Sequence, residues 1–226
     1  RPVTAPDNDV ANVDTLVLDL DGTLVDTNYH HALAWYRAFR RFDVTLPVWQ
    51  LHRAIGMGGD QLVTAVAGAR FEDEHGDDVR AAWAEEFEPM LAEVRPFGGV
   101  RDLLTHVRES GRKVVLASSG APDHVDTYLG TFDGRSLADA WTTSEDVDRT
   151  KPEPDLITAA LERVDGRAAL VIGDSVWDFE AAGRAGHAGW AVRTGGFSVD
   201  ELREAGAREV FDSLPELDQA LRRLLR

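Results

Sequence analysis

The chain has 226 residues, 43% of them hydrophobic, so it is long enough to bury one substantial core or a core with a smaller insert. Its formal net charge of −16 argues against broad binding to nucleic acid or anionic lipid, because both partners require a basic surface. The sequence contains no cysteine, which excludes disulfides, thiolate metal sites and cysteine nucleophiles. No run of about 18 apolar residues could span a membrane and no signal peptide is recognisable, so we expect a soluble, cytoplasmic protein.

The first predicted elements are a strand and a long helical segment. Residues 1–12, RPVTAPDNDVAN, are polar and are expected to form a mobile arm. Residues 15–21 form a mainly apolar run that ends in acidic residues. Such an apolar run is typical of a parallel strand covered on both faces. From residue 28 to about residue 94 no strand pattern appears, and apolar side chains such as Trp35 and Phe39 recur at helical spacing. This segment is therefore predicted to be a helical insert.

The rest of the chain alternates between predicted helices and strands. Helices are expected over 100–109, from about 122, over 154–164, from about 176 and over 214–225, and strands are expected over 113–118, 168–174 and 189–193. Such alternation indicates a parallel sheet with helices on both faces. The predicted fold class is α/β, with a Rossmann-like parallel sheet core built from residues 1–26 and 95–226. Residues 27–94 are predicted to form a small all-helical cap domain.

Three predicted strands end in polar residues, in the stretches LDLDGT, LASSG and VIGDS. Ligands of open parallel sheets bind at the carboxyl ends of the strands, so these residues are candidate site residues. For any single strand, the alternative that Asp and Ser only cap a helix or build a turn stays open. Capping does not explain why Asp19 and Asp21 lie on the same side of one strand end, where their repulsion makes double ionisation costly. A hard cation such as Mg²⁺ would compensate both acids.

Four short motifs, in this order, resemble those of the haloacid dehalogenase (HAD) superfamily. The first is DLDGTLVDT and the second is LASSG, and they are followed by TKPEPD and GDSVWD. The resemblance covers the core from about residue 13 to residue 193. The position of the helical insert is similar to that of the cap in the subgroup of phosphoglycolate phosphatase and β-phosphoglucomutase. The resemblance implies an aspartyl-phosphate mechanism and Mg²⁺ as cofactor.

The acids of the first and last motifs are assigned roles on chemistry and resemblance together. Asp19 is the predicted nucleophile, because a carboxylate can attack phosphorus and divide hydrolysis into two easier steps. Asp21 is the predicted general acid and base. By resemblance, Mg²⁺ is held by Asp19, by the backbone carbonyl of Asp21 and by Asp174. Asp178, one helical turn after Asp174, is expected to support or orient the metal ligands.

Residues of three motifs are predicted to bind the phosphoryl group. Ser118 is expected to bind one of its oxygens together with backbone N–H groups at Ser119, although a helix-capping role for Ser118 stays open. Thr23 is also predicted to bind the phosphoryl group, and its hydroxyl is expected to support Asp19 and Asp21. Lys151 is one of only two lysines in a chain that otherwise uses Arg, which indicates that a compact ammonium is needed there.

The helical insert is expected to determine the substrate. Its stretch RAIGMGGD is the predicted specificity loop, in which Gly56 allows a close approach and Arg53 binds a carboxylate or a second phosphate. A flexible helix connection is an equally good interpretation of this loop. His31 aligns with a histidine used by the mutase relatives, although His30 beside it leaves open that either one only starts a helix.

The predicted function is a Mg²⁺-dependent phosphatase that acts on a small phosphorylated metabolite, with no nucleic-acid or membrane partner and with the oligomeric state left open. Dehalogenase relatives lack the second acid of the first motif, and Asp21 is present here. The nearest alternative is a mutase similar to β-phosphoglucomutase, but Gly59 stands where the mutase cap usually carries a basic residue. The other alternative is a non-catalytic binding protein, which would be expected to lose Asp19, Asp21, Lys151 or Asp174, and none is lost.

Overall fold

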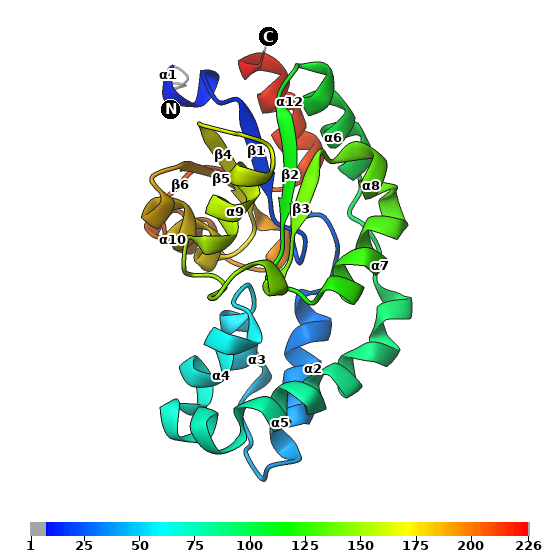
Figure 1. Cartoon of the computed structure of the whole chain (residues 1–226), viewed down its shortest axis with the longest axis vertical. Helices are drawn as coiled ribbons and strands as arrows, with labels where there is room; N and C mark the ends of the chain where they lie inside the picture. The colour runs from blue at the N-terminus through cyan, green and yellow to red at the C-terminus, as the bar shows by residue number, and fades with distance from the viewer. Residues whose placement is uncertain (1–7, 226) are drawn as a thin grey trace.

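The centre of the molecule is a six-stranded parallel sheet with strand order β3-β2-β1-β4-β5-β6 in a computed structural model that describes residues 8–225 (Figure 1). Strand β1 lies inside the sheet and pairs with β2 on one side and with β4 on the other. The strands are β1 (Thr15–Leu18), β2 (Lys113–Ala117), β3 (Ala140–Thr142), β4 (Ala169–Gly173), β5 (Ala188–Val192) and β6 (Ala207–Phe211).

Helices cover both faces of this sheet, and alternate strand residues contact different helices. Leu16 and Leu18 of β1 belong to a buried cluster with helices α6 (Val100–Glu109) and α12 (Leu214–Leu224). Val17, between them, belongs to a cluster with α9 (Asp155–Arg163) and α10 (Val176–Ala185) on the other face. This two-sided burial explains the continuous apolar run of β1. The predicted α/β fold class is confirmed.

Smaller helices complete the core. They are α1 (Asn8–Ala11), α7 (Pro122–Phe132), α8 (Gly134–Leu137) and α11 (Val199–Glu204). Residues 1–7 of the predicted mobile arm lie outside the described residues. Val10 is 2% exposed and packs into the main core cluster, so the prediction of a mobile arm is wrong for residues 8–11. None of the helices that the structure describes is long and apolar enough to cross a membrane.

Strand β1 is shorter than predicted, because the chain turns immediately after the first acid. Asp19 N donates to Ile172 O at 2.9 Å as the strand ends. The next residues fold back, with Leu24 N and Val25 N both donating to Leu20 O. Strands β3 and β6 form the two edges of the sheet and were not predicted as strands. β3 has only three residues, and β6 carries two exposed charged residues, Arg208 and Glu209, so neither shows a continuous apolar run.

Residues 28–93 form a group of helices below the carboxyl edge of the sheet (Figure 1). The group consists of α2 (Asn28–Arg40), α3 (Val48–Ala54), α4 (Gly59–Ala67), α5 (Ala69–Phe87) and the 3₁₀ helix η1 (Glu88–Glu93). It has a hydrophobic cluster of its own, which includes Trp35, Phe39 and Val79. We refer to residues 28–93 as the helical cap.

Two chain segments connect the helical cap to the sheet and lie side by side. Asp26 N donates to Arg95 O at 2.9 Å, and Phe97 N donates to Leu24 O at 2.9 Å. Backbone hydrogen bonds therefore hold the two connecting segments against each other. The predicted division into two domains at residues 27 and 94 stays a prediction.

Candidate active site

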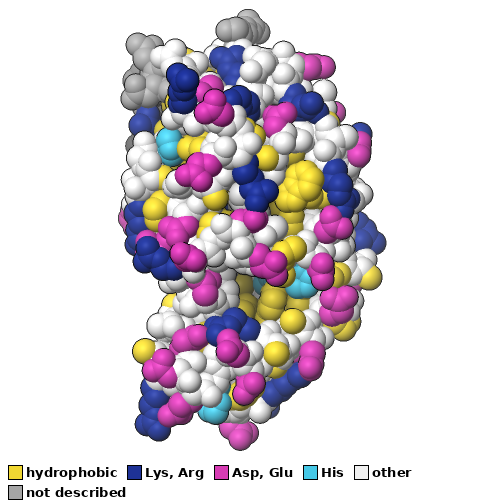
Figure 2. Space-filling model, in the orientation of Figure 1, with side chains coloured by type: hydrophobic (Ala, Val, Ile, Leu, Met, Phe, Trp, Pro, Cys, Tyr) yellow, Lys and Arg dark blue, Asp and Glu magenta, His cyan; other side chains and the backbone are white. Residues whose placement is uncertain are grey.

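The carboxyl edge of the sheet brings the polar strand ends together. Asp19 follows β1, Ser118 follows β2 and Asp174 follows β4, so the three come from neighbouring strands. A cavity of about 320 Å³ lies between this edge and the helical cap. Figure 2 shows the hollow between the two parts, with hydrophobic and histidine side chains inside it. Asp19, Asp21, His31 and Gly56 are among the predicted site residues that line the cavity.

A buried acidic cluster forms the floor of the site. Asp19, Asp174 and Asp178 each offer a ligand atom within 4.8 Å of the others. The Nζ atom of Lys151 lies 2.6 Å from Asp19 Oδ1 and 2.7 Å from Asp178 Oδ1. One ammonium thus contacts two of the three buried carboxylates, which leaves negative charge uncompensated in a region of low dielectric.

The pKa values of the cluster reflect this excess of negative charge. Burial raises the pKa of Asp19 and the neighbouring Asp178 and Asp174 add to the rise, against the opposing effect of Lys151. Burial and Asp178 raise the pKa of Asp174 to about 7, although Thr23 and Asn28 donate hydrogen bonds to it. Three buried carboxylates with too little positive charge are a donor set that fits a hard divalent cation.

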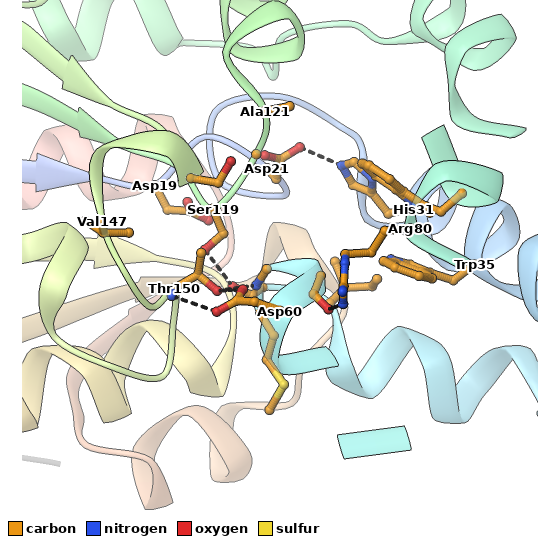
Figure 3. A pocket seen from close by; sticks show the side chains of 18 of the residues that line it. Asp19, Asp21, His31, Trp35, Asp60, Arg80, Ser119, Ala121, Val147 and Thr150 are labelled. Carbon is orange, nitrogen blue, oxygen red and sulfur yellow. Dashed lines mark hydrogen bonds and ion pairs between the residues drawn. The ribbon is translucent and has the colours of Figure 1, made fainter. Parts of the chain in front are cut away.

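Asp21 lies apart from this cluster, on the wall of the cavity (Figure 3). Its Oδ1 atom lies 2.8 Å from His31 Nε2 and accepts a hydrogen bond of 2.8 Å from Thr27 Oγ1. Its Oδ2 atom accepts from Ser118 Oγ at 3.2 Å. Burial opposes ionisation of Asp21, but His31 and these hydrogen bonds together lower its pKa to about 2. His31 itself is fixed by stacking on Phe87, with ring centroids 4.1 Å apart.

The residues predicted to bind phosphate take different positions. Ser118 is fully buried, and its hydroxyl donates to Asp21 and accepts from Gly120 N at 2.9 Å. Ser119 and Gly120 line the cavity. Thr23 is fully buried and does not line it; its hydroxyl donates to Asp174 Oδ1 at 2.6 Å. The structure thus places Thr23 behind the acidic cluster, next to Asp174, the predicted metal ligand.

The turn after Asp21 requires glycine. Gly22 has φ of +76°, and a Cβ atom there would lie 2.4 Å from the Asn28 amide and 2.5 Å from Asp174 Oδ2. The Asn28 amide donates to Asp174 Oδ2 at 2.8 Å, a contact that the sequence did not predict. Gly22 therefore lets the first turn of α2 reach the acid at the end of β4.

The predicted specificity loop contacts the sheet core closely. Gly56 has φ of +107°, and a Cβ atom there would lie 2.4 Å from Ser175 Oγ. Ser119 Oγ donates to Gly56 O at 3.3 Å. Trp177 Nε1 donates to Arg53 O at 3.0 Å. Glycine at position 56 thus allows the cap loop to lie against the turn that follows β4.

Two residues of the predicted specificity loop, Gly58 and Asp60, join the cap to Thr150, a residue to which the sequence analysis gave no role. Figure 3 shows Asp60 and Thr150 in contact. Gly58 N donates to Thr150 Oγ1 at 3.0 Å, and Thr150 Oγ1 donates to Asp60 Oδ1 at 2.5 Å. Thr150 N donates to Asp60 Oδ2 at 3.1 Å. We refer to Gly58, Asp60 and Thr150 as the cap latch. Because Thr150 directly precedes Lys151, the latch links the cap to the residue that contacts the acidic cluster.

Arg53 is not brought to the cavity. Its guanidinium forms an ion pair with Glu201 and lies 4.1 Å from the centre of the Phe197 ring, against the sheet core. Arg80 of α5 lines the cavity instead. The sequence analysis missed Arg80 because it lies in a long helix without a motif. α5 packs against both α2 and α4, and Arg80 Nη1 donates to the carbonyl of Gly59 at the start of α4.

Replacing Thr150 with Val should lower kcat/KM about tenfold without unfolding the protein. The substitution keeps the shape of the side chain but leaves the buried Gly58 N–H without its acceptor, which destabilises the contact between the cap and the core by about 1–3 kcal/mol. Steady-state kinetics with thermal unfolding would measure both effects. Thr150→Ser retains the hydroxyl and is the matched control. Equal activity of the two variants would contradict a role for the latch.

A parallel α/β core with carboxylates at its carboxyl edge, covered by a helical cap, defines a class of capped hydrolytic enzymes. The chain belongs to the haloacid dehalogenase-like hydrolase family, whose family model matches residues 13–186. The predicted family and the prediction of an enzyme are confirmed.

Relatives with known names or structures agree with this family. The crystal structure of a hydrolase from Pseudomonas syringae has a TM-score of 0.87 and 30% identity, with 92% of this chain and 98% of that chain covered. A phosphoglycolate phosphatase from Caulobacter vibrioides is 27% identical over 93% of this chain and 92% of its own length. The validoxylamine A 7'-phosphate phosphatase of Streptomyces hygroscopicus subsp. limoneus is 26% identical over 75% of this chain and 81% of its own.

Proposed function

We propose that this protein is a Mg²⁺-dependent phosphatase that hydrolyses a small phosphorylated metabolite through an aspartyl-phosphate intermediate. The observation that carries the proposal is the position of Asp19, buried against Lys151 while lining the same cavity as Asp21. The names of the phosphatase relatives support the reaction class. The two carboxylates are in distinct environments, which suits one as nucleophile and the other as acid and base.

The first step uses Asp19 as the nucleophile. A carboxylate oxygen of Asp19 forms a bond to phosphorus, while the bond between phosphorus and the leaving oxygen breaks. Lys151, 2.6 Å from Asp19 Oδ1, fixes the orientation of the carboxylate. The proton that the leaving alkoxide needs comes from the protonated form of Asp21, which the negative charge of the phosphoryl group bound beside it favours against the contacts with His31, Thr27 and Ser118. Asp21 regains this proton from water in the second step. The backbone N–H of Ser119, a residue that lines the cavity, is the donor proposed for a phosphoryl oxygen, whereas the N–H of Gly120 donates to Ser118 Oγ.

The second step uses Asp21 as the base. Its carboxylate takes a proton from a water molecule, whose oxygen attacks phosphorus as the bond to Asp19 breaks and inorganic phosphate leaves. The contacts with His31, Thr27 and Ser118 favour the ionised form of Asp21, which is the form that a base requires. The same contacts fix the direction of the carboxylate.

Asp19, Asp174 and Asp178 are the side chains proposed to hold Mg²⁺, together with the backbone carbonyl of Asp21. Bound Mg²⁺ would neutralise the acids and polarise the phosphoryl group. Thr23 and Asn28 each donate to a different oxygen of Asp174, at 2.6 and 2.8 Å, and thereby hold this ligand in place.

Hydrolysis of 4-nitrophenyl phosphate tests the proposed function. We expect phosphate release in Mg²⁺, loss of activity in excess chelator, and recovery when Mg²⁺ is restored, because the uncompensated acids would otherwise repel the substrate. Thermal unfolding with and without chelator shows that the protein itself stays folded. Full activity in excess chelator would refute the metal role.

Net hydrolysis, rather than isomerisation, is expected with a hexose phosphate. Gly59 carries no cation that could hold the second phosphate of a sugar bisphosphate while it reorients. β-Glucose 1-phosphate, supplied with a trace of the 1,6-bisphosphate, should therefore yield little glucose 6-phosphate. Coupled assays of glucose 6-phosphate and free phosphate measure the two outcomes. Rapid isomerisation without phosphate release would show that the protein is a mutase.

A further inference from the structure

We propose that the leaving group of the substrate is an alcohol without negative charge. This inference rests on the proposed phosphatase function and specifies the class of its substrate. The residues that line the cavity fall into two groups. Asp19, Asp21 and Ser119 mark the phosphoryl end, and the remaining wall, here called the leaving-group wall, comes from the cap and from the loop after β3. The charges and surfaces of the leaving-group wall carry the proposal.

The first observation is that the only cationic Lys or Arg side chain lining the described cavity is already neutralised. Arg80 Nη1 lies 2.9 Å from both carboxylate oxygens of Glu72, and Nη2 lies 2.7 Å from Asp77 Oδ1. Nη1 also donates to Gly59 O at 3.3 Å. Two carboxylates therefore surround one guanidinium, and most of its donors are used within the protein.

The second observation is that two further carboxylates belong to this wall. Asp60 and Asp148 both line the cavity. Asp60 accepts hydrogen bonds from Thr150 and Gln61, neither of which carries a charge. Because Arg80 is compensated separately, the wall keeps a net negative charge, and a second phosphate or a carboxylate on the leaving group would be repelled.

The third observation is that Arg53, the other cation near the cap loop, is directed away from the cavity. Arg53 pairs with Glu201 and lies over Phe197, so it is held against the sheet core. Lys151 is engaged with Asp19 and Asp178 at the phosphoryl end. Neither residue is placed to receive an anionic leaving group.

Apolar side chains form a further part of the wall. Ile55 and Met57 of the cap loop line the cavity together with Trp35 and Trp83, whose rings stack with centroids 5.3 Å apart. Such a surface packs well against the C–H face of an alcohol or sugar-like skeleton, and it offers a charged group no compensation for lost hydration. The apolar surface and the negative charge of the wall thus both disfavour an anionic leaving group.

A matched pair of substrates tests the inference. Glycerol 3-phosphate and 3-phosphoglycerate both release a three-carbon alcohol, but the second bears a carboxylate where the first has a hydroxymethyl group. We expect kcat/KM to be about tenfold or more higher for glycerol 3-phosphate, because the charge meets the negative wall. 4-Nitrophenyl phosphate provides the reference activity. A ratio of one, or a preference for 3-phosphoglycerate, would overturn the inference.

Two single substitutions test whether the leaving-group wall causes the preference for glycerol 3-phosphate. Asp148→Asn removes one charge from an exposed side chain of the wall and should reduce the ratio about threefold. Asp200→Asn removes the same charge from an exposed position that does not line the cavity, and should leave the ratio unchanged. An unchanged ratio in Asp148→Asn would overturn the assignment to this wall. If no substrate is hydrolysed, including 4-nitrophenyl phosphate, the proposed phosphatase function fails and this inference fails with it.

Discussion

Replacing Asp19 with Asn should abolish turnover, lowering kcat by about 10⁴-fold or more, while the protein stays folded. The amide keeps the shape of the side chain and an oxygen that can accept from Lys151, but it is a poor nucleophile. Removing one of three clustered carboxylates also relieves repulsion within the buried cluster. Phosphate release from 4-nitrophenyl phosphate and thermal unfolding would measure the two effects.

A matched control lies in the same sequence motif. Asp26 is exposed, does not line the cavity, and follows the first acid by seven positions. Asp26→Asn should therefore retain the turnover of the natural protein. Turnover by Asp19→Asn at the level of this control would rule out Asp19 as the nucleophile.

The strand ends explain why much of the candidate site could be predicted from the sequence. Residues that follow parallel strands must reach one edge of the sheet, so the positions after β1, β2 and β4 indicated that Asp19, Ser118 and Asp174 would meet. Lys151 was predicted from the TKPEPD motif, and its choice was supported by composition, since the chain uses Arg almost everywhere else. Its contacts with Asp19 and Asp178 give this choice a physical reason, because a compact ammonium fits between two buried carboxylates.

The cap contacts could not be predicted in the same way, because they depend on how helices are rotated and packed. Arg53 lies next to the glycine loop in the sequence, yet the packing of α3 directs it toward Glu201. Arg80 is more than twenty residues from that loop in the sequence, but it donates to the carbonyl of Gly59. Sequence proximity therefore favoured Arg53, whereas Arg80 is the arginine that lines the cavity.

The contacts of Asp21 show a similar limit. The sequence placed Asp21 beside the phosphate and indicated a role for His31, but it did not connect the two residues. The contact of 2.8 Å between them requires α2 to begin close below the end of β1. Thr27, at the start of α2, then reaches the same carboxylate oxygen, an arrangement that no local pattern encodes.

Replacing Asp21 with Asn should separate the two steps of the proposed reaction. 4-Nitrophenolate leaves without a proton, so phosphorylation of Asp19 should still occur, whereas the attacking water loses its base. We expect a burst of nitrophenolate close to one equivalent of enzyme, followed by a steady rate about 10²- to 10⁴-fold below that of the natural protein. The amide oxygen can still accept from Thr27, which preserves the position of the side chain.

Rapid-quench mass spectrometry of the Asp21→Asn protein would detect the covalent intermediate directly. The phosphorylated chain should accumulate during the burst and should be absent when Asp19→Asn is added to the same protein, because the acceptor is then missing. An alkyl phosphate should give no burst, since its leaving oxygen needs the proton that Asn cannot supply. A slow steady rate with neither a burst nor a phosphorylated chain would mean that water attacks the substrate directly, and that Asp19 acts by binding rather than by forming a bond to phosphorus.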